Sequence, residues 1–401
     1  MTEGGILRRS VRSPRHDRAE RPFLVIWEAT RACALACAHC RAEAIPHRSP
    51  FELSTAQAID LMADVAAFGN PAPIFVITGG DPFERPDIFE IIEEGKSLGL
   101  TVAMSPSATS LLNPTSIQEL VSRGLTSISL SLDGASASVH DAFRGIPGTF
   151  DRTIAAWRYA RSQGLKVQIN TTVTADNVGD LPAVAALVKS NGAMTWSAFL
   201  LVPTGRGSQL AAPSPAEIED ILNFLYDVGS VIPTRTTEGH HFRRVVIQRD
   251  ELERQGLDHE VELKLGPLYR ALREQADELG LLNADRVRRP PLNVSAGSGF
   301  VFVSHTGEVQ PSGFLDVSAG NVKHESLATI YQESELFTGI RDLRNLRGRC
   351  GMCEFKQVCG GSRARAYASS GDIWADDPLC SYGPATHPVD SAPPVESTAF
   401  R

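Results

Sequence analysis

Apolar runs of strand length alternate with helical patterns along the first half of the chain. This alternation is typical of parallel βα units, in which each strand is followed by a helix that returns the chain. Strands are predicted over residues 23–27, 74–78, 101–104, 127–132, 166–171 and 195–202. The fold class is therefore α/β. With right-handed crossovers, six such units form either an open barrel or a doubly wound sheet, and periodicity does not choose between them.

Helices are predicted between these strands. The clearest begins after Ser54, because Gln57 three residues later completes a capping-box signal and Gly69 ends the apolar periodicity. Similar patterns predict helices over residues 87–98, 116–123, 150–163, 181–189 and 215–228.

Beyond the sixth strand the pattern is less regular. His240, His241, Arg243 and Arg244 could hold an acidic substrate, but a solvated loop that leads into a strand over residues 245–248 is the simpler interpretation. Residues 250–290 are charged and largely helical and end in a Pro-rich linker. The apolar runs within residues 300–309 predict a hairpin around a His-Thr-Gly turn.

These changes of pattern divide the chain into five predicted segments. They are a flexible basic tail (1–21), the βα unit (22–232), a helical insert and linker (233–295), a small cysteine-containing domain (296–382) and a disordered tail rich in Pro, Ser and Thr (383–401).

The composition is ordinary for a globular protein, with 42% hydrophobic and 21% charged residues. A net charge of −8 gives no electrostatic reason to expect a nucleic acid partner. The arginines of residues 1–21 surround no apolar core, so this segment is neither a signal peptide nor a membrane span. We therefore expect a cytoplasmic protein with neither a nucleic acid nor a membrane as partner.

All seven cysteines fall into two groups, which leaves none for disulfides and fits a reducing compartment. Cys33, Cys37 and Cys40 form a C-x3-C-x2-C array directly after the first predicted strand. Zinc sites and ordinary ferredoxin clusters take four protein ligands, so three thiolates on one loop predict a centre with one open position. Three buried cysteines that act only as small hydrophobes are the poorer interpretation, because Cys is scarce and these three are clustered.

The triplet and its place after the first strand resemble the radical S-adenosylmethionine (radical SAM) superfamily. The resemblance implies that Cys33, Cys37 and Cys40 bind a [4Fe-4S] cluster whose fourth iron is chelated by S-adenosylmethionine (SAM). An electron from the cluster then cleaves SAM to methionine and a 5′-deoxyadenosyl radical. The family also implies a partial (β/α)6 barrel over about residues 23–231 and a reducing partner such as flavodoxin or ferredoxin.

A second motif follows the second predicted strand, at the end where parallel α/β proteins gather their chemistry. Gly79, Gly80, Asp81 and Pro82 resemble the family's G-G-E-P motif, which implies a contact with the SAM amino group, largely through backbone groups. The same four residues are a strong turn signal in any protein, and both interpretations can hold.

A third motif begins at the end of the fourth strand and resembles the family pattern S-x-D-G…H-D-x-x-R-G. It implies that Ser131 and Arg144 approach the SAM carboxylate and ribose, and a guanidinium fork suits a carboxylate. Asp133 and His140 belong to the same pattern and are predicted to be turn and cap residues.

The second group of cysteines can close a zinc site or bind every iron of a [4Fe-4S] cluster, and spacing alone leaves both open. Its members are Cys350, Cys353, Cys359 and Cys380. Their C-x2-C-x5-C run resembles the SPASM-type extension of radical SAM enzymes, which carries auxiliary clusters. The full SPASM pattern places further cysteines near Ser312 and Ser362. The resemblance therefore implies one auxiliary [4Fe-4S] cluster here and a small twitch-like or SPASM-like C-terminal domain.

The stretch from Cys359 to Cys380 resembles the radical SAM proteins of alternative haem and haem d1 synthesis, which modify propionate or acetate chains of sirohaem-derived tetrapyrroles. We predict a radical SAM enzyme of oxidoreductase or lyase type that abstracts hydrogen from a small-molecule or peptide substrate, such as a tetrapyrrole side chain that is decarboxylated or oxidised. The alternatives are a maturase of a ribosomally made peptide, a dehydrogenase or epimerase of a natural-product precursor, a two-cluster electron carrier and a zinc-binding interaction protein.

Overall fold

The computed structural model describes residues 10–283 and 286–384. Seven parallel strands lie next to one another in chain order. They are β1 (Leu24–Glu28), β2 (Ile74–Thr78), β3 (Val102–Met104), β4 (Ser127–Ser131), β5 (Lys166–Val173), β6 (Thr195–Leu200) and β7 (Thr234–Thr237). Each of the six predicted strands is present within two residues of its expected bounds. β7 was not predicted, because its polar Thr-Arg-Thr-Thr sequence carries no apolar signal.

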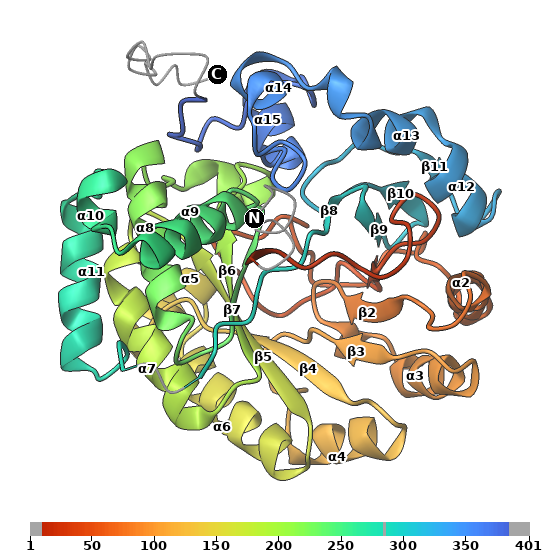
Figure 1. Cartoon of the computed structure of the whole chain (residues 1–401). Coiled ribbons are helices and arrows are strands. Elements are labelled where there is room, and N and C mark those ends of the chain that lie inside the picture. Colours follow the sequence, from red (N-terminus) through yellow and green to blue (C-terminus); the bar gives the residue numbers. More distant parts are fainter. Residues whose placement is uncertain (1–9, 284–285, 385–401) are drawn as a thin grey trace.

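The sheet curves into an open barrel with helices on its outer side (Figure 1). These helices are α2 (Thr55–Ala67), α3 (Ile88–Ser97), α4 (Pro114–Ser122), α6 (Thr149–Ser162), α7 (Leu181–Asn191) and α8 (Pro215–Val228). A doubly wound sheet reverses its strand order at a switch point. Here the order from β1 to β7 has no reversal, so the partial barrel is confirmed.

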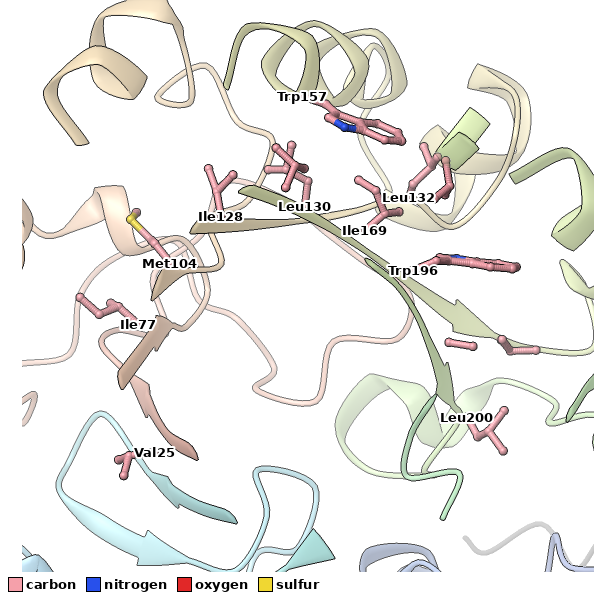
Figure 2. Packing of buried hydrophobic residues seen from close by; sticks show 14 of the residues in the cluster. Val25, Ile77, Met104, Ile128, Leu130, Leu132, Trp157, Ile169, Trp196 and Leu200 are labelled. Carbon is pink, nitrogen blue, oxygen red and sulfur yellow. The ribbon is translucent and has the colours of Figure 1, made fainter. Parts of the chain in front are cut away.

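The local sequence explains how these elements form. The predicted capping box is present at the start of α2, where Ser54 accepts a hydrogen bond from the N–H of Gln57. Alternate strand residues such as Ile128, Ile169 and Trp196 then bury their side chains between the sheet and the helices (Figure 2). Each such side chain contributes about 1.5–3 kcal/mol on burial.

The predicted hairpin is confirmed as the antiparallel pair β9 (Gly299–Val303) and β10 (Glu308–Gln310), with β8 (Ser295–Ala296) and β11 (Gly320–Asn321) beside it. β9 also pairs in parallel with β1, with Leu24 opposite Phe300 and Trp27 opposite Val303. The hairpin therefore extends the barrel's own sheet, and the boundary predicted at residue 296 falls within one sheet of eleven strands.

The region between β7 and the hairpin is helical, as predicted, but the strand expected over residues 245–248 is wrong. These residues lie inside α9 (Phe242–Gln255), which is followed by α10 (His259–Glu262) and α11 (Pro267–Glu278). Val245, Val246 and Ile247 favour a strand locally, because they are β-branched. Packing of α9 against α8 overrides that preference.

The segment before β1 lies against the body of the protein. Arg12 N–H donates to the carbonyl of Pro291 at 2.9 Å, and Nη1 of Arg18 donates to the carbonyl of Asn293 at 3.0 Å. For residues 10–21 the prediction of a flexible tail is therefore wrong. Residues 1–9 and 385–401, which make up the remainder of the two predicted tails, lie outside the described residues.

After β11 the chain forms α12 (Leu327–Glu333), α13 (Glu335–Arg341), α14 (Gly348–Met352) and α15 (Arg363–Ser370). Within the part of the chain that the structure describes, no helix has both the length and the apolar character needed to cross a membrane.

Candidate functional site

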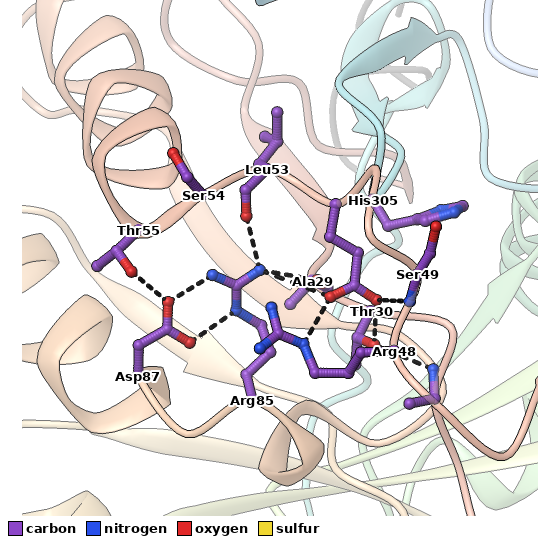
Figure 3. Close-up of polar contacts among 12 residues, drawn as sticks. Ala29, Thr30, Arg48, Ser49, Leu53, Ser54, Thr55, Arg85, Asp87 and His305 are labelled. Atoms are coloured by element: carbon purple, nitrogen blue, oxygen red, sulfur yellow. Dashed lines mark hydrogen bonds and ion pairs between the residues drawn. The ribbon is translucent and has the colours of Figure 1, made fainter.

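The loop that carries the first cysteine group leaves the end of β1 and rests on a buried polar network (Figure 3). Nη1 of Arg85 donates to the carbonyl of Ala29 at 3.3 Å, and Oγ1 of Thr30 donates to the carboxylate of Glu52 at 2.5 Å. Both contacts fix the backbone just before Cys33. Contacts within the protein thus hold the start of the cysteine loop in place.

The structure brings the three predicted cysteines together. Cys33 and Cys37 belong to one small buried cluster, and Cys40 packs against it. The N–H of Leu35 donates to Sγ of Cys33 at 3.3 Å, and the N–H of Ala44 donates to Sγ of Cys40 at 3.4 Å. Burial raises the pKa of Cys33 to about 11, so a bound iron would have to displace its proton.

The two glycines of the second motif pack directly against this loop. An ideal Cβ on Gly79 would lie 2.4 Å from the carbonyl oxygen of Thr30, and one on Gly80 would lie 2.3 Å from that of Ala32. Any side chain would clash with backbone at both positions. The N–H groups of Gly80 and Asp81 donate to the same two carbonyls, each at 2.7 Å. The motif and the cysteine loop therefore form one rigid unit.

The carboxylate of Asp81 is directed into the protein. It accepts hydrogen bonds from Oγ1 of Thr109 at 2.7 Å and from the N–H of Phe83 at 3.3 Å, just ahead of the short 3-10 turn that starts at Pro82. Burial raises the pKa of Asp81 to about 6. These contacts engage both carboxylate oxygens, so the Asp81 side chain is held by neighbouring residues of the protein.

The third motif places Ser131 at the end of β4 and Arg144 at the end of α5 (Ala137–Arg144), a helix that periodicity did not predict. Arg144 is buried and donates to the carboxylate of Asp133. Its Nη1 also lies 3.6 Å from Sγ of Cys37. Burial alone would raise the pKa of Asp133, but the charge of Arg144 outweighs it and the pKa lies below its usual value.

Asp133 and His140 make contacts beyond the turn and cap roles predicted for them. Both are almost fully buried. Asp133 accepts a hydrogen bond from the N–H of Thr172 at 2.7 Å, and its own N–H donates to Nδ1 of His140 at 3.0 Å. These contacts orient the partner of Arg144.

Several buried donors around the triplet have no partner among the described residues. They are Nε of Arg144, Nδ1 of His39 and Nη2 of Arg206. Nε of Arg206 donates to the carbonyl of Cys37 at 2.9 Å, so this side chain lies at the cysteine loop. Buried polar groups normally find partners, and a ligand rich in acceptors, as SAM is, fits these residues. Arg206 was missed as a candidate; its one sequence signal is its place just after β6.

The four cysteines of the second group line a single pocket, together with His241 and Arg244. Gly361 closes one side. Its φ is +66°, and an ideal Cβ there would lie 3.1 Å from Sγ of Cys350. Burial raises the pKa of both Cys359 and Cys380 to about 12.

Within the described residues, no three His, Cys, Asp or Glu side chains converge as closely as the ligands of a single metal ion do. In a [4Fe-4S] cluster each cysteine binds a different iron, so the sulfurs stand further apart. Four thiols around one pocket are a donor set that fits such a cluster.

His240, His241, Arg243 and Arg244 are all buried at the start of α9, so their interpretation as a solvated loop is wrong. Nη1 of Arg243 donates to the carbonyl of Val358 at 2.8 Å, next to Cys359. A run of charged and polar residues looks solvent-exposed in sequence. Only the fold shows that it packs on the cysteine-bearing segment more than a hundred residues later.

Comparisons with known proteins extend over nearly the whole chain. A model of the Radical SAM superfamily matches residues 27–188. The "AdoMet-dependent heme synthase" of Nitratidesulfovibrio vulgaris is 40% identical over 369 residues, which cover 90% of this chain and 92% of that protein. The "Fe-coproporphyrin III synthase" of Methanosarcina barkeri is 31% identical, covering 89% of this chain and 87% of its own.

Among solved structures, Streptococcus suis SuiB bound to S-adenosylmethionine superimposes with a TM-score of 0.64 at 15% identity. The match covers 90% of this chain and 78% of SuiB. At this identity the likeness concerns the fold.

Proposed function

Because the chain belongs to the radical SAM superfamily, we propose that it removes carboxyl groups from the propionate side chains of an iron tetrapyrrole. Membership confirms the predicted class of enzyme, its partial-barrel fold and its use of SAM with a [4Fe-4S] cluster. An auxiliary cluster is typical of its SPASM-type relatives. The observation that carries the substrate class is the 40% identity to a haem synthase over 90% of the chain.

The proposed reaction follows from the chemistry of haem. Haem carries vinyl groups at positions where iron coproporphyrin III carries propionates, and the latter compound appears in the name of a second relative. Conversion of –CH2–CH2–COO⁻ to –CH=CH2 releases CO2 and requires the removal of one hydrogen atom and one electron. When bound, SAM and its cluster supply the 5′-deoxyadenosyl radical that accepts the hydrogen. The electron for SAM cleavage comes from a reducing partner such as a flavodoxin or ferredoxin.

Cys33, Cys37 and Cys40 would hold the SAM-binding cluster on the loop after β1. The backbone of the second motif, which is fixed against that loop, would contact the SAM amino group. Ser131 and Arg144 would take the carboxylate and ribose, since a guanidinium next to Sγ of Cys37 stands beside the cluster ligands.

The second cysteine group would hold an auxiliary cluster that takes the electron released from the substrate. Four cysteines leave no iron open for SAM, so this site needs a role other than SAM cleavage. The proposed decarboxylation supplies one, because each carboxyl lost leaves one electron to be removed.

The test is the dependence of 5′-deoxyadenosine formation on substrate. Anaerobically reconstituted, chemically reduced enzyme is incubated with SAM and either iron coproporphyrin III, its methyl ester or no tetrapyrrole. The free acid should raise the rate of 5′-deoxyadenosine formation well above the other two. If neither tetrapyrrole raises the rate while background SAM cleavage persists, the substrate assignment is wrong and the peptide-maturase alternative becomes the one to test.

A further inference from the structure

His241 lies at the start of α9 with 1% of its surface exposed, and it lines the pocket formed by the second cysteine group. Both of its ring nitrogens, Nδ1 and Nε2, are buried without a hydrogen-bond partner among the described residues. A buried donor left unsatisfied costs about 1–3 kcal/mol. An imidazole in this position therefore calls for an acceptor inside the pocket.

The described residues do not provide that acceptor. The nearest carboxylate oxygen, Oδ2 of Asp377, lies 3.9 Å from Nδ1 of His241. Asp377 already accepts hydrogen bonds from the N–H of Ser362 at 2.8 Å and from Nε of Arg365 at 2.9 Å. It also accepts one from the N–H of Leu379 at 3.1 Å.

Two further carboxylates lie near the pocket. Asp376 lines it, accepts a hydrogen bond from the N–H of Cys350 at 2.7 Å and lies 3.5 Å from Nε of Arg349. Glu219 is engaged as well. It binds the guanidinium of Arg244 through two contacts, at 2.8 and 2.5 Å. Hence all three carboxylates already have partners other than the imidazole.

Several cationic side chains also lie at the same pocket. Arg244 lines it, and Nη2 of Arg363 lies 3.7 Å from Sγ of Cys350 while Nε of Arg363 has no partner among the described residues. Arg349 lines the pocket too, and its Nη1 donates to the carbonyl of Cys380 at 3.2 Å. The four thiolates of a bound cluster would thus lie close to cations and unpaired donors, with the carboxylates of Asp376 and Asp377 also in the lining.

We propose that His241 donates a hydrogen bond to a sulfur of the auxiliary cluster and thereby raises the reduction potential of that cluster. Reduction adds one negative charge, so an N–H donor and nearby cations stabilise the reduced state more than the oxidised one. A raised potential suits a cluster that must accept an electron. Only the electron-accepting role of the cluster rests on the proposed function. The hydrogen bond is inferred from the unpaired nitrogens of His241 in the pocket.

The test uses full-length protein with Cys33, Cys37 and Cys40 each replaced by Ala, so that the auxiliary cluster is the one reconstituted. A redox titration followed by EPR gives its midpoint potential. His241→Leu should make reduction about tenfold less favourable, about 59 mV for one electron. His241→Gln keeps an N–H donor, so its midpoint potential should lie close to that of the parent protein.

The matched control is His240→Leu, because His240 is the neighbouring buried histidine that does not line the pocket. Its potential should equal that of the parent protein. An unchanged potential in His241→Leu, or an equal shift in His240→Leu, would overturn the proposal.

A second measurement needs no apolar substitution. Protein labelled with 15N-histidine should show a weak nitrogen coupling to the reduced cluster by pulsed EPR, and the coupling should vanish in His241→Gln. Its absence from the labelled parent protein also overturns the proposal. Neither measurement involves a substrate, so the failure of tetrapyrroles to react leaves both results intact.

Discussion

Nη1 of Arg144 lies 3.6 Å from Sγ of Cys37, and the same guanidinium is paired with the buried carboxylate of Asp133. One side chain thus connects the cysteine loop after β1 to the end of β4. In the proposed enzyme it would stand at the junction of the cluster ligands and the bound SAM.

Replacement of Arg144 separates its binding role from its structural one. Arg144→Ala alone leaves Asp133 as an unpaired buried charge, which costs about 3–5 kcal/mol of stability. The double variant Arg144→Ala, Asp133→Asn removes that charge and should fold with normal iron content. Its SAM affinity, measured by calorimetry, should fall by about 1.5–3 kcal/mol, roughly ten- to a hundredfold. Wild-type affinity in the double variant would make Arg144 purely structural.

The two cysteine groups predict the metal content. Anaerobically reconstituted protein should hold about eight irons as two [4Fe-4S] clusters. Cys33→Ala, Cys37→Ala or Cys40→Ala should each abolish SAM cleavage and lower the count to about four irons, because each removes a ligand of the SAM-binding centre only. Stoichiometric zinc together with about four irons in the parent protein would instead assign the second group to zinc.

Substitution of Cys353 and Cys359 should uncouple SAM cleavage from product formation. The first cysteine group is untouched, so 5′-deoxyadenosine should still form, while conversion of the tetrapyrrole fails for lack of an electron acceptor. Both yields are measured in one reaction, with folding checked by circular dichroism. A wild-type ratio of product to 5′-deoxyadenosine would show that the auxiliary site only stabilises the fold of the C-terminal segment.

Asp81 predicts a pH dependence of stability. Its folded-state pKa of about 6 lies above the ordinary value of 3.8. The folded state therefore binds this proton more tightly than the unfolded state, and stability falls as pH rises from about 4 to about 6. Asp81→Asn lacks this loss, so it should be more stable than wild type by about 2–3 kcal/mol at pH 7 and about equal at pH 4.

Denaturant unfolding of the cluster-free protein at several pH values measures this difference. Asp87→Asn is a control of opposite sign. Burial would raise the pKa of Asp87, but its contacts with Arg85 and Thr55 hold that pKa below the ordinary value, so this variant should lose stability at pH 7. An Asp81→Asn variant that is less stable than wild type at pH 7 would show that the carboxylate is needed in its ionised form.

Local signals explain which parts of the fold could be predicted from the sequence. α8 has the predicted bounds because Ser214 and Glu217 form a capping box at its start. β2 does so because its apolar run ends at two glycines. The cysteine triplet was recognisable for a similar reason, since its three members share one short loop.

The elements that were predicted wrongly or not at all depend on contacts between distant segments. The start of α9 was predicted as a loop followed by a strand. In the structure residues 350–380 pack on it, and His241 and Arg244 are buried there. β7 is polar and exists because β6 provides a parallel edge for it. The pairing of Asp133 with Arg144 requires a helix, α5, which at eight residues is too short to show a clear helical periodicity in the sequence.

The most direct measurement follows the hydrogen atom itself. Iron coproporphyrin III deuterated at the methylene carbons of its propionates is incubated with reduced enzyme and SAM, and both 5′-deoxyadenosine and the tetrapyrrole are analysed by mass spectrometry. We predict one deuterium in each 5′-deoxyadenosine and the loss of the elements of formic acid for each propionate converted to a vinyl group. Unlabelled 5′-deoxyadenosine beside a tetrapyrrole of unchanged mass would contradict the proposed function.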